Sequence, residues 1–433
     1  MVDTEQLHKA FLSSNGACTD TRKLLPGGMF FALRGPNFDA NSFAAEALKQ
    51  GCAFAVVDDQ SVVTDERFIL VTDVLKALQE LARHHRRSLD IPFIAITGTN
   101  GKTTTKELAF AVLSADRPTL ATEGNLNNHI GVPLTLLNLK PEHRIAIIEM
   151  GASKLGDIAE LCAIAEPTHG LITNIGKAHL EGFGSVDGVI RTKTELYAWL
   201  REHHGLAFVN GDDALLMEKS QGILRETYGT SDGNDLRGRS KESGTPFLHV
   251  QFENSDKMGT REVETHLIGD YNTPNVLAAI GMGRHFHIAD EVMKDAISNY
   301  RPANSRSQFK DTGRNELVLD AYNANPTSMA AALENFAKLP SDRRKLVILG
   351  DMRELGATSA EEHQAIVRQL EKLGLDAMLV GGEFMRTSGG NSLRRFADAE
   401  AALTALTEEH PEASIILIKG SRGIKLETVI PAL

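Results

Sequence analysis

Short, unbroken apolar runs alternate with helical stretches through most of the chain, and this pattern constrains its fold more than any other feature. Such runs occur at PFIAIT (92–97), RIAIIEM (144–150) and GLITNI (170–175), and again in the last third of the sequence. A strand with one face in water alternates polar and apolar residues, whereas a strand covered on both faces does not. The pattern therefore predicts an α/β protein built on parallel sheets.

The 433 residues suggest about three domains. Residues 1–88 are expected to form a small α/β unit and residues 301–433 a third α/β unit. The central unit, 89–300, is expected to add antiparallel strands, FLHVQF and VETHLI, to its parallel sheet after a polar loop at 230–245. The segment 83–92 reads equally well as a linker or as the exposed end of a helix.

Composition excludes several classes of protein. The 46 basic and 57 acidic residues give a net charge of −11, which argues against a broad nucleic-acid surface. No apolar run approaches the roughly 20 residues that span a bilayer, and no secretory signal is apparent, so no stable membrane insertion is expected. Three scattered cysteines, Cys18, Cys52 and Cys162, suit a reducing cytoplasm. Any anionic ligand must therefore be held by a local site.

The segment TGTNGKTTTKE (97–107) follows an apolar run and precedes a helical stretch. Gly98 and Gly101 allow backbone N–H groups to converge on a phosphate, and the helix N-terminus adds partial positive charge. Lys102 supplies a full charge, and the Thr103 hydroxyl can bind Mg²⁺. The general phosphate-loop pattern places glycine where this chain has Ile96, so a tight strand–helix turn with a chance lysine is the alternative.

Polar residues follow two more central strands. Glu149 comes directly after four apolar residues, and His179 lies just past another strand. Ligands of parallel sheets gather at the carboxyl ends of strands, so these residues and Thr103 are candidate metal ligands. Alone, Glu149 could equally be a capping or ion-paired carboxylate, and His179 a hydrogen-bonded loop histidine.

Lys193 falls on the apolar face of the helical stretch 186–200. Lysine is seldom buried without a partner, and burial lowers its pKa and makes the neutral amine available. The alternative is a lysine at the edge of the stripe whose ammonium reaches water.

The third unit repeats the theme of polar residues at strand ends. Asp320, Tyr322, Asn323 and Asn325 cluster after one strand, and KGSRG (419–423) follows another. These residues predict a second polar cleft, although ordinary turn chemistry also favours Asn, Asp and Gly.

Taken together and in order, these segments resemble the Mur ligases, ATP-dependent enzymes that form amide bonds in peptidoglycan precursor synthesis. The shortened loop at 97–107 has this family's form, which accounts for Ile96. The other matching segments are TDTRKLLPGGMFFALRG (19–35), GNLNNHIGVPLTLL (124–137), EMGAS (149–153), TNIGKAHLEGFGS (173–185), RTKTEL (191–196), GDYNTPNVLAA (269–279), DAYNANPTSM (320–329), LGDMRELG (349–356) with His363, and KGSRGIKLE (419–427).

Within the family the chain looks most like the MurF branch, because DAYNANPTSM is present and the D-N-P-R stretch common in MurE enzymes is not. The resemblance implies an N-terminal unit for a uridine nucleotide, a central ATPase-like unit and a Rossmann-like C-terminal unit. It implies that an acyl phosphate forms on UDP-N-acetylmuramoyl-tripeptide and is attacked by D-alanyl-D-alanine. Open alternatives are a MurE-type or folylpolyglutamate-synthetase-like ligase, and a nucleotide switch that makes no amide bond.

The resemblance also implies residue roles. Lys102, Glu149, His179 and Lys193 are expected to carry catalysis, with Thr103 and Glu149 at one Mg²⁺ and His179 and an N-carbamylated Lys193 at a second. A monomer is expected, and Asn41 stands where the family often has histidine. ATP contacts are expected from Thr97, Gly98, Thr99, Asn100, Gly101, Lys102, Thr103, Thr104, Asn272, Asn275, Arg306 and Asp320. Substrate contacts are expected from Thr21, Arg22, Asn127, Asn128, Tyr322, Asn323 and Asn325.

Overall fold

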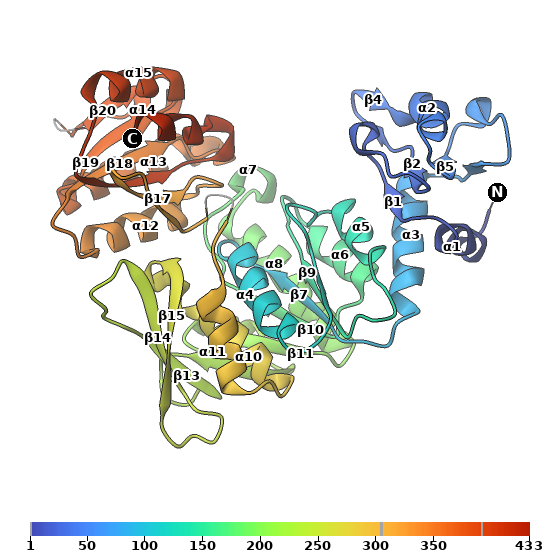
Figure 1. Cartoon of the computed structure of the whole chain (residues 1–433), viewed down its shortest axis with the longest axis horizontal. Helices are drawn as coiled ribbons and strands as arrows, with labels where there is room; N and C mark the ends of the chain where they lie inside the picture. Colours follow the sequence, from blue (N-terminus) through green and yellow to red (C-terminus); the bar gives the residue numbers. More distant parts are fainter. Residues whose placement is uncertain (1, 304–305, 391–392) are drawn as a thin grey trace.

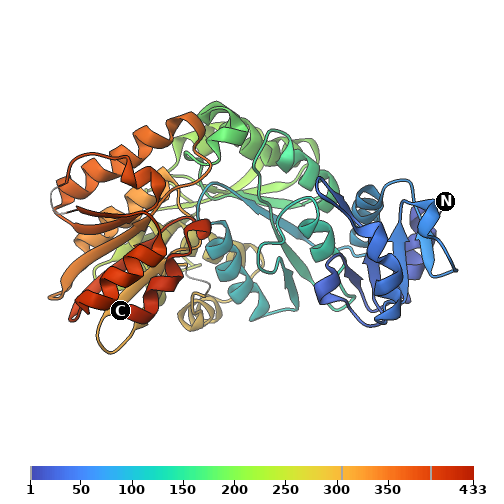
Figure 2. The same cartoon turned by 90° about the horizontal axis from the view of Figure 1, so that it is seen from above.

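The computed structural model of the protein describes residues 2–303, 306–390 and 393–433. Within these residues the strands form three main sheets, each in its own part of the chain, and one two-stranded ribbon. Figures 1 and 2 show the three parts in a row, with the N-terminal and C-terminal parts on opposite sides of the central one.

The N-terminal part is a parallel sheet in the order β1-β2-β5-β6, beside the antiparallel ribbon β3-β4. Its strands are β1 (Ala17–Cys18), β2 (Met29–Phe31), β3 (Arg34–Gly35), β4 (Phe38–Asp39), β5 (Phe54–Val57) and β6 (Phe68–Leu70). Its helices are α1 (Thr4–Leu12), η1 (Thr21–Lys23), η2 (Ala40–Phe43), α2 (Ala44–Lys49), η3 (Gln60–Val62) and α3 (Val74–Arg87).

Helix α3 connects the N-terminal and central parts. Asp73 caps its first turn by accepting a hydrogen bond from the Lys76 N–H at 2.9 Å, and Val74, Leu78 and Leu81 are buried at helical spacing. The helix continues to Arg87, so the helix-end interpretation of 83–92 is correct for its first half.

The central part is a nine-stranded sheet in the order β15-β14-β13-β12-β11-β10-β7-β9-β8. It is parallel from β8 to β13, and β13, β14 and β15 pair antiparallel. Its strands are β7 (Phe93–Thr97), β8 (Thr119–Ala121), β9 (Ile145–Glu149), β10 (His169–Ile172), β11 (Leu206–Asn210), β12 (Leu224–Gly229), β13 (Leu236–Lys241), β14 (Phe247–Glu253) and β15 (Thr260–Ile268). Its helices are α4 (Lys102–Ser114), α5 (Gly131–Leu136), α6 (Asp157–Ala165), α7 (Leu180–Phe183), α8 (Val186–Glu202), α9 (Ala214–Lys219), η4 (Asp270–Asn272), α10 (Thr273–His285) and α11 (Asp290–Asn299).

Strand β13 corrects one prediction, because it lies inside the segment 230–245 that was expected to be a loop. The segment is rich in Gly, Ser and charged residues, which have low strand propensity. Its alternation of buried Leu236 and Gly238 with exposed Arg237 and Arg239 was the signal for a strand, and pairing with β12 and β14 on both sides stabilises it.

Helices cover both faces of the central sheet, which explains its unbroken apolar strands. Phe93 and Ala95 of β7 pack into a core with residues of α3, α5, α6 and α8, and Ile94 and Ile96 pack on the other face with α4, α10 and α11. The predicted parallel, doubly covered sheet with added antiparallel strands is confirmed.

The C-terminal part is a six-stranded sheet in the order β16-β17-β21-β18-β19-β20, parallel except for the edge strand β16. Its strands are β16 (Gln308–Asp311), β17 (Glu316–Asp320), β18 (Arg344–Gly350), β19 (Asp376–Val380), β20 (Leu393–Phe396) and β21 (Ser414–Lys419). Its helices are α12 (Pro326–Lys338), η5 (Gly356–Thr358), α13 (Ser359–Leu373), α14 (Gly382–Met385), α15 (Ala399–Glu409), η6 (Arg422–Ile424) and η7 (Leu426–Ala432).

The predicted domain limits of 1–88, 89–300 and 301–433 stay predictions. One apolar core runs from Leu7 and Phe11 of α1 through α3 to Phe93 of β7, so packing continues across the first of these limits. Among the helices in the described ranges, every one is too short or too polar to cross a bilayer.

Two neighbouring histidines, His169 and His285, lie at the amino end of strand β10. The two Nε2 atoms of His169 and His285 are 3.1 Å apart, and His285 Nδ1 is 2.8 Å from Glu226 Oε1. Burial, and then the neighbouring His285, lowers the pKa of His169 to about 4.

We expect acid to destabilise the protein through His169. The ring is neutral in the folded chain, whereas an unfolded histidine takes a proton near pH 6.5, so stability is lost as the pH falls from about 6.5 to about 4, by at most about 2 kcal/mol at pH 5. The melting temperature of His169→Gln should fall less than that of the wild type between pH 7 and pH 5. A control, His204→Asn at an exposed histidine, should keep the wild-type acid sensitivity; equal acid sensitivity in all three proteins would contradict the assignment.

Candidate active site

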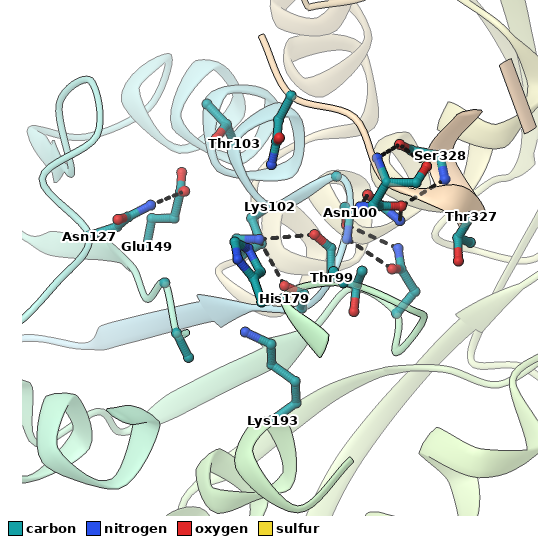
Figure 3. Close-up of a pocket in the computed structure, with 18 of the residues that line it drawn as sticks. Thr99, Asn100, Lys102, Thr103, Asn127, Glu149, His179, Lys193, Thr327 and Ser328 are labelled. Carbon is teal, nitrogen blue, oxygen red and sulfur yellow. Dashed lines mark hydrogen bonds between the residues drawn. The ribbon is translucent and has the colours of Figure 1, made fainter. Parts of the chain in front are cut away.

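A cavity of about 700 Å³ lies between the central and C-terminal parts. A volume of this size is typical of small-molecule sites. Most of the residues predicted as ATP, metal or substrate contacts line it, and Figure 3 shows several of them. From the central part these are Gly98, Thr99, Asn100, Gly101, Lys102, Thr103, Thr104, Asn127, Asn128, Glu149, His179, Lys193, Asn272 and Asn275, and from the C-terminal side Arg306, Asp320, Tyr322, Asn323 and Asn325.

The loop between β7 and α4 has two glycines with positive φ and is hydrogen-bonded to Asn174. Gly98 and Gly101 have φ values of +142° and +79°, which L side chains rarely adopt. The N–H groups of Thr99 and Asn100 donate to the carbonyl and side-chain oxygens of Asn174, at 2.9 and 3.0 Å. Asn174 therefore fixes the loop, although sequence reasoning did not single it out.

Lys102 is the first residue of α4, and its ammonium folds back over the loop. It donates to the carbonyl oxygens of Gly98 and Thr99 at 2.8 and 3.1 Å, an arrangement drawn in Figure 3. Burial lowers the pKa of Lys102, while the nearby Glu149 carboxylate opposes that shift. A cation held among loop carbonyls at a helix N-terminus is placed to receive a phosphate.

Two residues at the start of this segment are buried in the sheet. Ile96 is fully buried in β7, because the strand continues one residue further and the loop begins only at Gly98. The Thr97 hydroxyl donates to the Met150 carbonyl at 2.8 Å, and this side chain is outside the cavity lining. Thr97 thus links the start of the loop to Met150, the residue that follows β9.

Glu149 ends β9 and carries an unpartnered oxygen into the site. Its Oε1 accepts a hydrogen bond from Asn127 Nδ2 at 2.8 Å, whereas Oε2 is buried and has no hydrogen-bond partner. Buried carboxylate oxygens are rarely left unpaired, so this oxygen fits a cation that the structure does not contain. Asn128 lines the same wall, and its Oδ1 accepts from the N–H groups of Ile130 and Gly131.

Lys193 lies on α8 with only 3% of its surface exposed. Within the described part of the chain its ammonium makes no hydrogen bond, and it lies 5.8 Å from the centroid of the Phe183 ring. Burial, reinforced by the charge of Lys102, lowers the pKa of Lys193 to about 7. Of the two interpretations of its position, the buried one is correct.

His179 precedes α7 with a left-handed backbone, φ +50°. Its Nδ1 contacts the carboxylate of Glu354 of the C-terminal part. Burial is the main cause that lowers the pKa of His179, and the carboxylate of Glu354 opposes it. Across residues 2–303, 306–390 and 393–433, no three His, Cys, Asp or Glu side chains gather closely enough to hold a metal.

Asn272 and Asn275 form a buried chain that joins α10 to α4. The Thr105 hydroxyl donates to Asn275 Oδ1 at 3.0 Å, Asn275 Nδ2 donates to Asn272 Oδ1 at 2.9 Å, and Asn272 Nδ2 donates to the Ile268 carbonyl at 2.9 Å. Both amides line the cavity beside the phosphate loop. A Cβ on Gly101 would lie 2.8 Å from Asn275 Oδ1, so glycine is required where the loop meets this chain.

The C-terminal side contributes three charged groups to the cavity, those of Arg306, Asp320 and Lys419. The guanidinium of Arg306 stacks 3.6 Å above the ring centroid of Tyr322. Asp320 is ion-paired with Lys419, which is 2% exposed. Lys419 begins the segment KGSRG, which the sequence predicted as part of a polar cleft, and register places it directly beside Asp320.

Asn325 joins the two parts at the loop. It caps α12 by accepting from the Ser328 N–H, and its Nδ2 donates to Asn100 Oδ1 at 2.7 Å. The Asn323 side chain accepts from the Ala324 N–H, and its carbonyl faces Lys419. The phosphate loop and the start of α12 are therefore in direct contact, as the dashed lines of Figure 3 show.

The N-terminal residues Thr21 and Arg22 are not part of this cavity. They belong to η1, and the exposed Arg22 guanidinium pairs with Asp20 at 2.8 Å. Asn41 is buried, and its Nδ2 donates to Asp39 and Asp58. Asn41 therefore stabilises a turn of the N-terminal part.

Family comparisons agree with this geometry. The family model for the Mur ligase middle domain matches residues 96–283, and the one for the Mur ligase, glutamate ligase domain matches residues 305–422. The chain is 35% identical over 431 residues to the UDP-N-acetylmuramoyl-tripeptide–D-alanyl-D-alanine ligase of Bacillus subtilis (strain 168), covering 96% of this chain and 92% of that protein.

The chain belongs to the Mur ligase family. Among solved structures it is similar to MurF from Acinetobacter baumannii, with 31% identity, a TM-score of 0.87, and coverage of 99% of this chain and 97% of that one. It is also similar to MurF ligase from Thermotoga maritima in complex with ADP, with 26% identity, a TM-score of 0.86, and coverage of 100% and 98%. The predicted Mur ligase fold and family are thereby confirmed.

Gly98 offers a direct test of the phosphate loop. A Cβ at this position would lie 2.0 Å from the Thr173 hydroxyl, on a backbone that disfavours any side chain. We expect Gly98→Ala to lose ATP binding and about 1–3 kcal/mol of stability. The control, Gly233→Ala, also has positive φ but open space around its Cβ, and it should lose stability only. Calorimetric titration with an ATP analogue measures the affinity of both variants, and thermal unfolding measures their stability. Wild-type affinity in Gly98→Ala would contradict the assignment.

Proposed function

We propose that this chain is an ATP-dependent ligase that joins D-alanyl-D-alanine to UDP-N-acetylmuramoyl-tripeptide in peptidoglycan precursor synthesis. The observation that carries the proposal is that one cavity holds both the phosphate loop of the central part and the polar strand ends of the C-terminal part. The similarity to ligases with this printed name, over nearly the full length of the chain, supports it. The site and the family agree on the same chemistry.

ATP is the nucleotide that the loop would hold. Its phosphates would replace the loop carbonyls around the Lys102 ammonium and accept hydrogen bonds from the N-terminus of α4. Asn272, Asn275, Arg306 and Asp320 line the same cavity and are the proposed contacts to the rest of the nucleotide. Arg306 and Asp320 come from the C-terminal side, so both parts would meet one ATP molecule.

The reaction requires two anions, a peptide carboxylate and the γ-phosphate, to approach closely. Lys102 would screen their repulsion and align the phosphate, in the preorganised way that makes electrostatic stabilisation effective. The carboxylate oxygen attacks the γ-phosphorus and ADP leaves, giving an acyl phosphate. The dipeptide amine then attacks the acyl carbon, and inorganic phosphate leaves as the amide forms.

Magnesium would fit beside Glu149, because the buried Oε2 of this residue lacks a partner and Thr103 lines the same cavity. When bound, Mg²⁺ neutralises charge on the transferring phosphoryl group. A second cation would lie near His179 and Lys193. Because no cluster of three conventional ligands exists in the described ranges, we propose that Lys193 is N-carbamylated and supplies carboxylate-like oxygens there.

The remaining contacts follow from the layout of the chain. Thr21 and Arg22 of the N-terminal part would meet the uridine nucleotide, and Asn127 and Asn128 the muramyl region. Tyr322, Asn323 and Asn325 would lie where the dipeptide enters. The C-terminal part would close further on the central one before chemistry. We further propose that the protein acts as a monomer in the cytoplasm.

The amine acceptor tests the function directly. With the tripeptide nucleotide and ATP present, D-alanyl-D-alanine should increase ADP and phosphate release, whereas single amino acids and glutamate should not. Lys102→Ala should lower the rate by about 10²–10³-fold, because a preorganised charge at the transferring phosphate is lost.

The outcome of this assay separates the alternatives. Stimulation by a single amino acid or by glutamate would favour a MurE-type or folylpolyglutamate-synthetase-like ligase. Hydrolysis that ignores every acceptor would favour a nucleotide switch. Either result would contradict the proposed reaction.

Carbamylation of Lys193 has a pH signature. Only the neutral amine reacts with CO₂, and with a pKa of about 7 the neutral fraction falls from about nine-tenths at pH 8 to about one-tenth at pH 6. A carbamate signal in ¹³C NMR with labelled bicarbonate should therefore weaken over this range. The signal should vanish in Lys193→Ala and persist in Lys140→Ala, an exposed lysine. A signal that survives in Lys193→Ala would contradict the assignment.

A further inference from the structure

The imidazole of His179 lies where the central and C-terminal parts meet. Its Nδ1 is engaged by the Glu354 carboxylate, which belongs to the loop after β18. A carboxylate only accepts hydrogen bonds, so the neutral ring carries its proton on Nδ1 and presents an unprotonated Nε2. Among the described residues, Nε2 has no hydrogen-bond partner.

The Nε2 atom of His179 therefore faces the cavity. His179 lines it together with Lys193 and Lys102, and the charges of both lysines act on the histidine. Figure 3 shows the Lys193 side chain pointing toward His179 from α8. A basic nitrogen that faces the proposed carbamate is thus available for a cation.

Glu354 is held in place by its own part of the protein. Its backbone has φ +63°, the neighbouring Leu355 is buried, and the Arg353 N–H donates to Ser421 Oγ at 3.0 Å. The Glu354 carbonyl also accepts from the Glu181 N–H of α7, at 3.4 Å. Both its backbone and its side chain therefore meet the segment that carries His179, from a loop anchored in the C-terminal part.

We infer that Glu354 is a positioning residue that orients His179 toward a divalent cation and fixes its tautomer. Histidines that bind metals commonly donate their second ring N–H to a carboxylate, which raises the basicity of the ligand nitrogen. Here that carboxylate comes from a different part of the chain than the ligand. The inference rests on the proposed function, because it needs the cation near His179.

This arrangement couples cation binding to the contact between the two parts. If the contact raises the cation affinity of His179, then the bound cation strengthens the contact by the same factor, because the coupling free energy is reciprocal. The C-terminal part, which contributes Arg306 and Asp320 to the proposed ATP site, would thereby complete the metal site as well.

The chain offers a matched control in a second ion pair between the same parts. Lys177 Nζ contacts Glu362 Oε1 at 2.6 Å, close to His179 in sequence but without touching its ring. Removing the Glu362 carboxylate weakens the contact between the parts and leaves the His179 partner intact. Comparing variants of Glu354 and Glu362 therefore separates the effect of orienting His179 from the effect of weakening the contact between the two parts.

Binding of Mn²⁺, followed by electron paramagnetic resonance in the presence of an ATP analogue, tests the inference without relying on activity. Glu354→Ala should weaken one class of Mn²⁺ site by about 10–100-fold. Glu354→Gln should recover part of the affinity, because the amide oxygen still accepts from Nδ1. Glu362→Ala should bind Mn²⁺ as the wild type does, and circular dichroism should show all variants folded.

Two results would overturn the inference: unchanged Mn²⁺ affinity in Glu354→Ala, or equal weakening in Glu362→Ala. Ligation by the wild type is measured separately with the tripeptide nucleotide and D-alanyl-D-alanine. Normal ligation with unchanged Mn²⁺ affinity in Glu354→Ala refutes the positioning role alone. Absence of ATP-dependent ligation in the wild type refutes the proposed function.

Discussion

The alignment of three neighbouring strand ends is the constraint on which the site depends. Strand β7 lies between β9 and β10 in a parallel sheet, with Ile96 beside Glu149 and Thr97 beside Ile172. Parallel strands deliver their carboxyl ends to the same edge, so the phosphate loop, Glu149 and the segment leading to His179 emerge together. The helices on both faces keep these strands in register, because each strand is buried on both sides.

The cavity carries charge that the folded chain leaves uncompensated. Burial disfavours the charged forms of Lys102 and Lys193, and an oxygen of Glu149 lacks a partner. Such an arrangement costs stability unless ligands complete it, and for that reason uncompensated charge is concentrated at functional sites. The overall charge of −11 thus coexists with a local cluster of cations suited to a polyanion and a peptide acid.

The C-terminal part acts as the second wall of the site. Asn325 meets Asn100 of the phosphate loop, Glu354 meets His179, and Glu362 meets Lys177. These contacts join residues that are far apart in sequence and place both parts around one cavity.

Local sequence determined much of the protein. The unbroken apolar runs predicted covered parallel strands, and the glycines around Lys102 predicted the loop before α4. The helical spacing around Lys193 allowed either a buried position or one at the edge of the apolar stripe, and the structure shows the buried one. Each of these signals acts over one strand, turn or helix, and the backbone rules that produce them operate within that range. Strand β13 was missed because its residues are poor strand formers, and pairing with two neighbours decided its structure.

Only the tertiary structure decided which polar residues meet. The ion pair Asp320–Lys419 and the contact His179–Glu354 join residues separated by long stretches of chain, and no local pattern marks Glu354 as a partner of a histidine. Sheet order and the docking of the C-terminal part set these contacts. Both arise from the packing of apolar faces, and many different sequences could supply such faces. The apolar strands were therefore readable from their own residues, whereas the neighbours of each strand depended on how all the faces packed together.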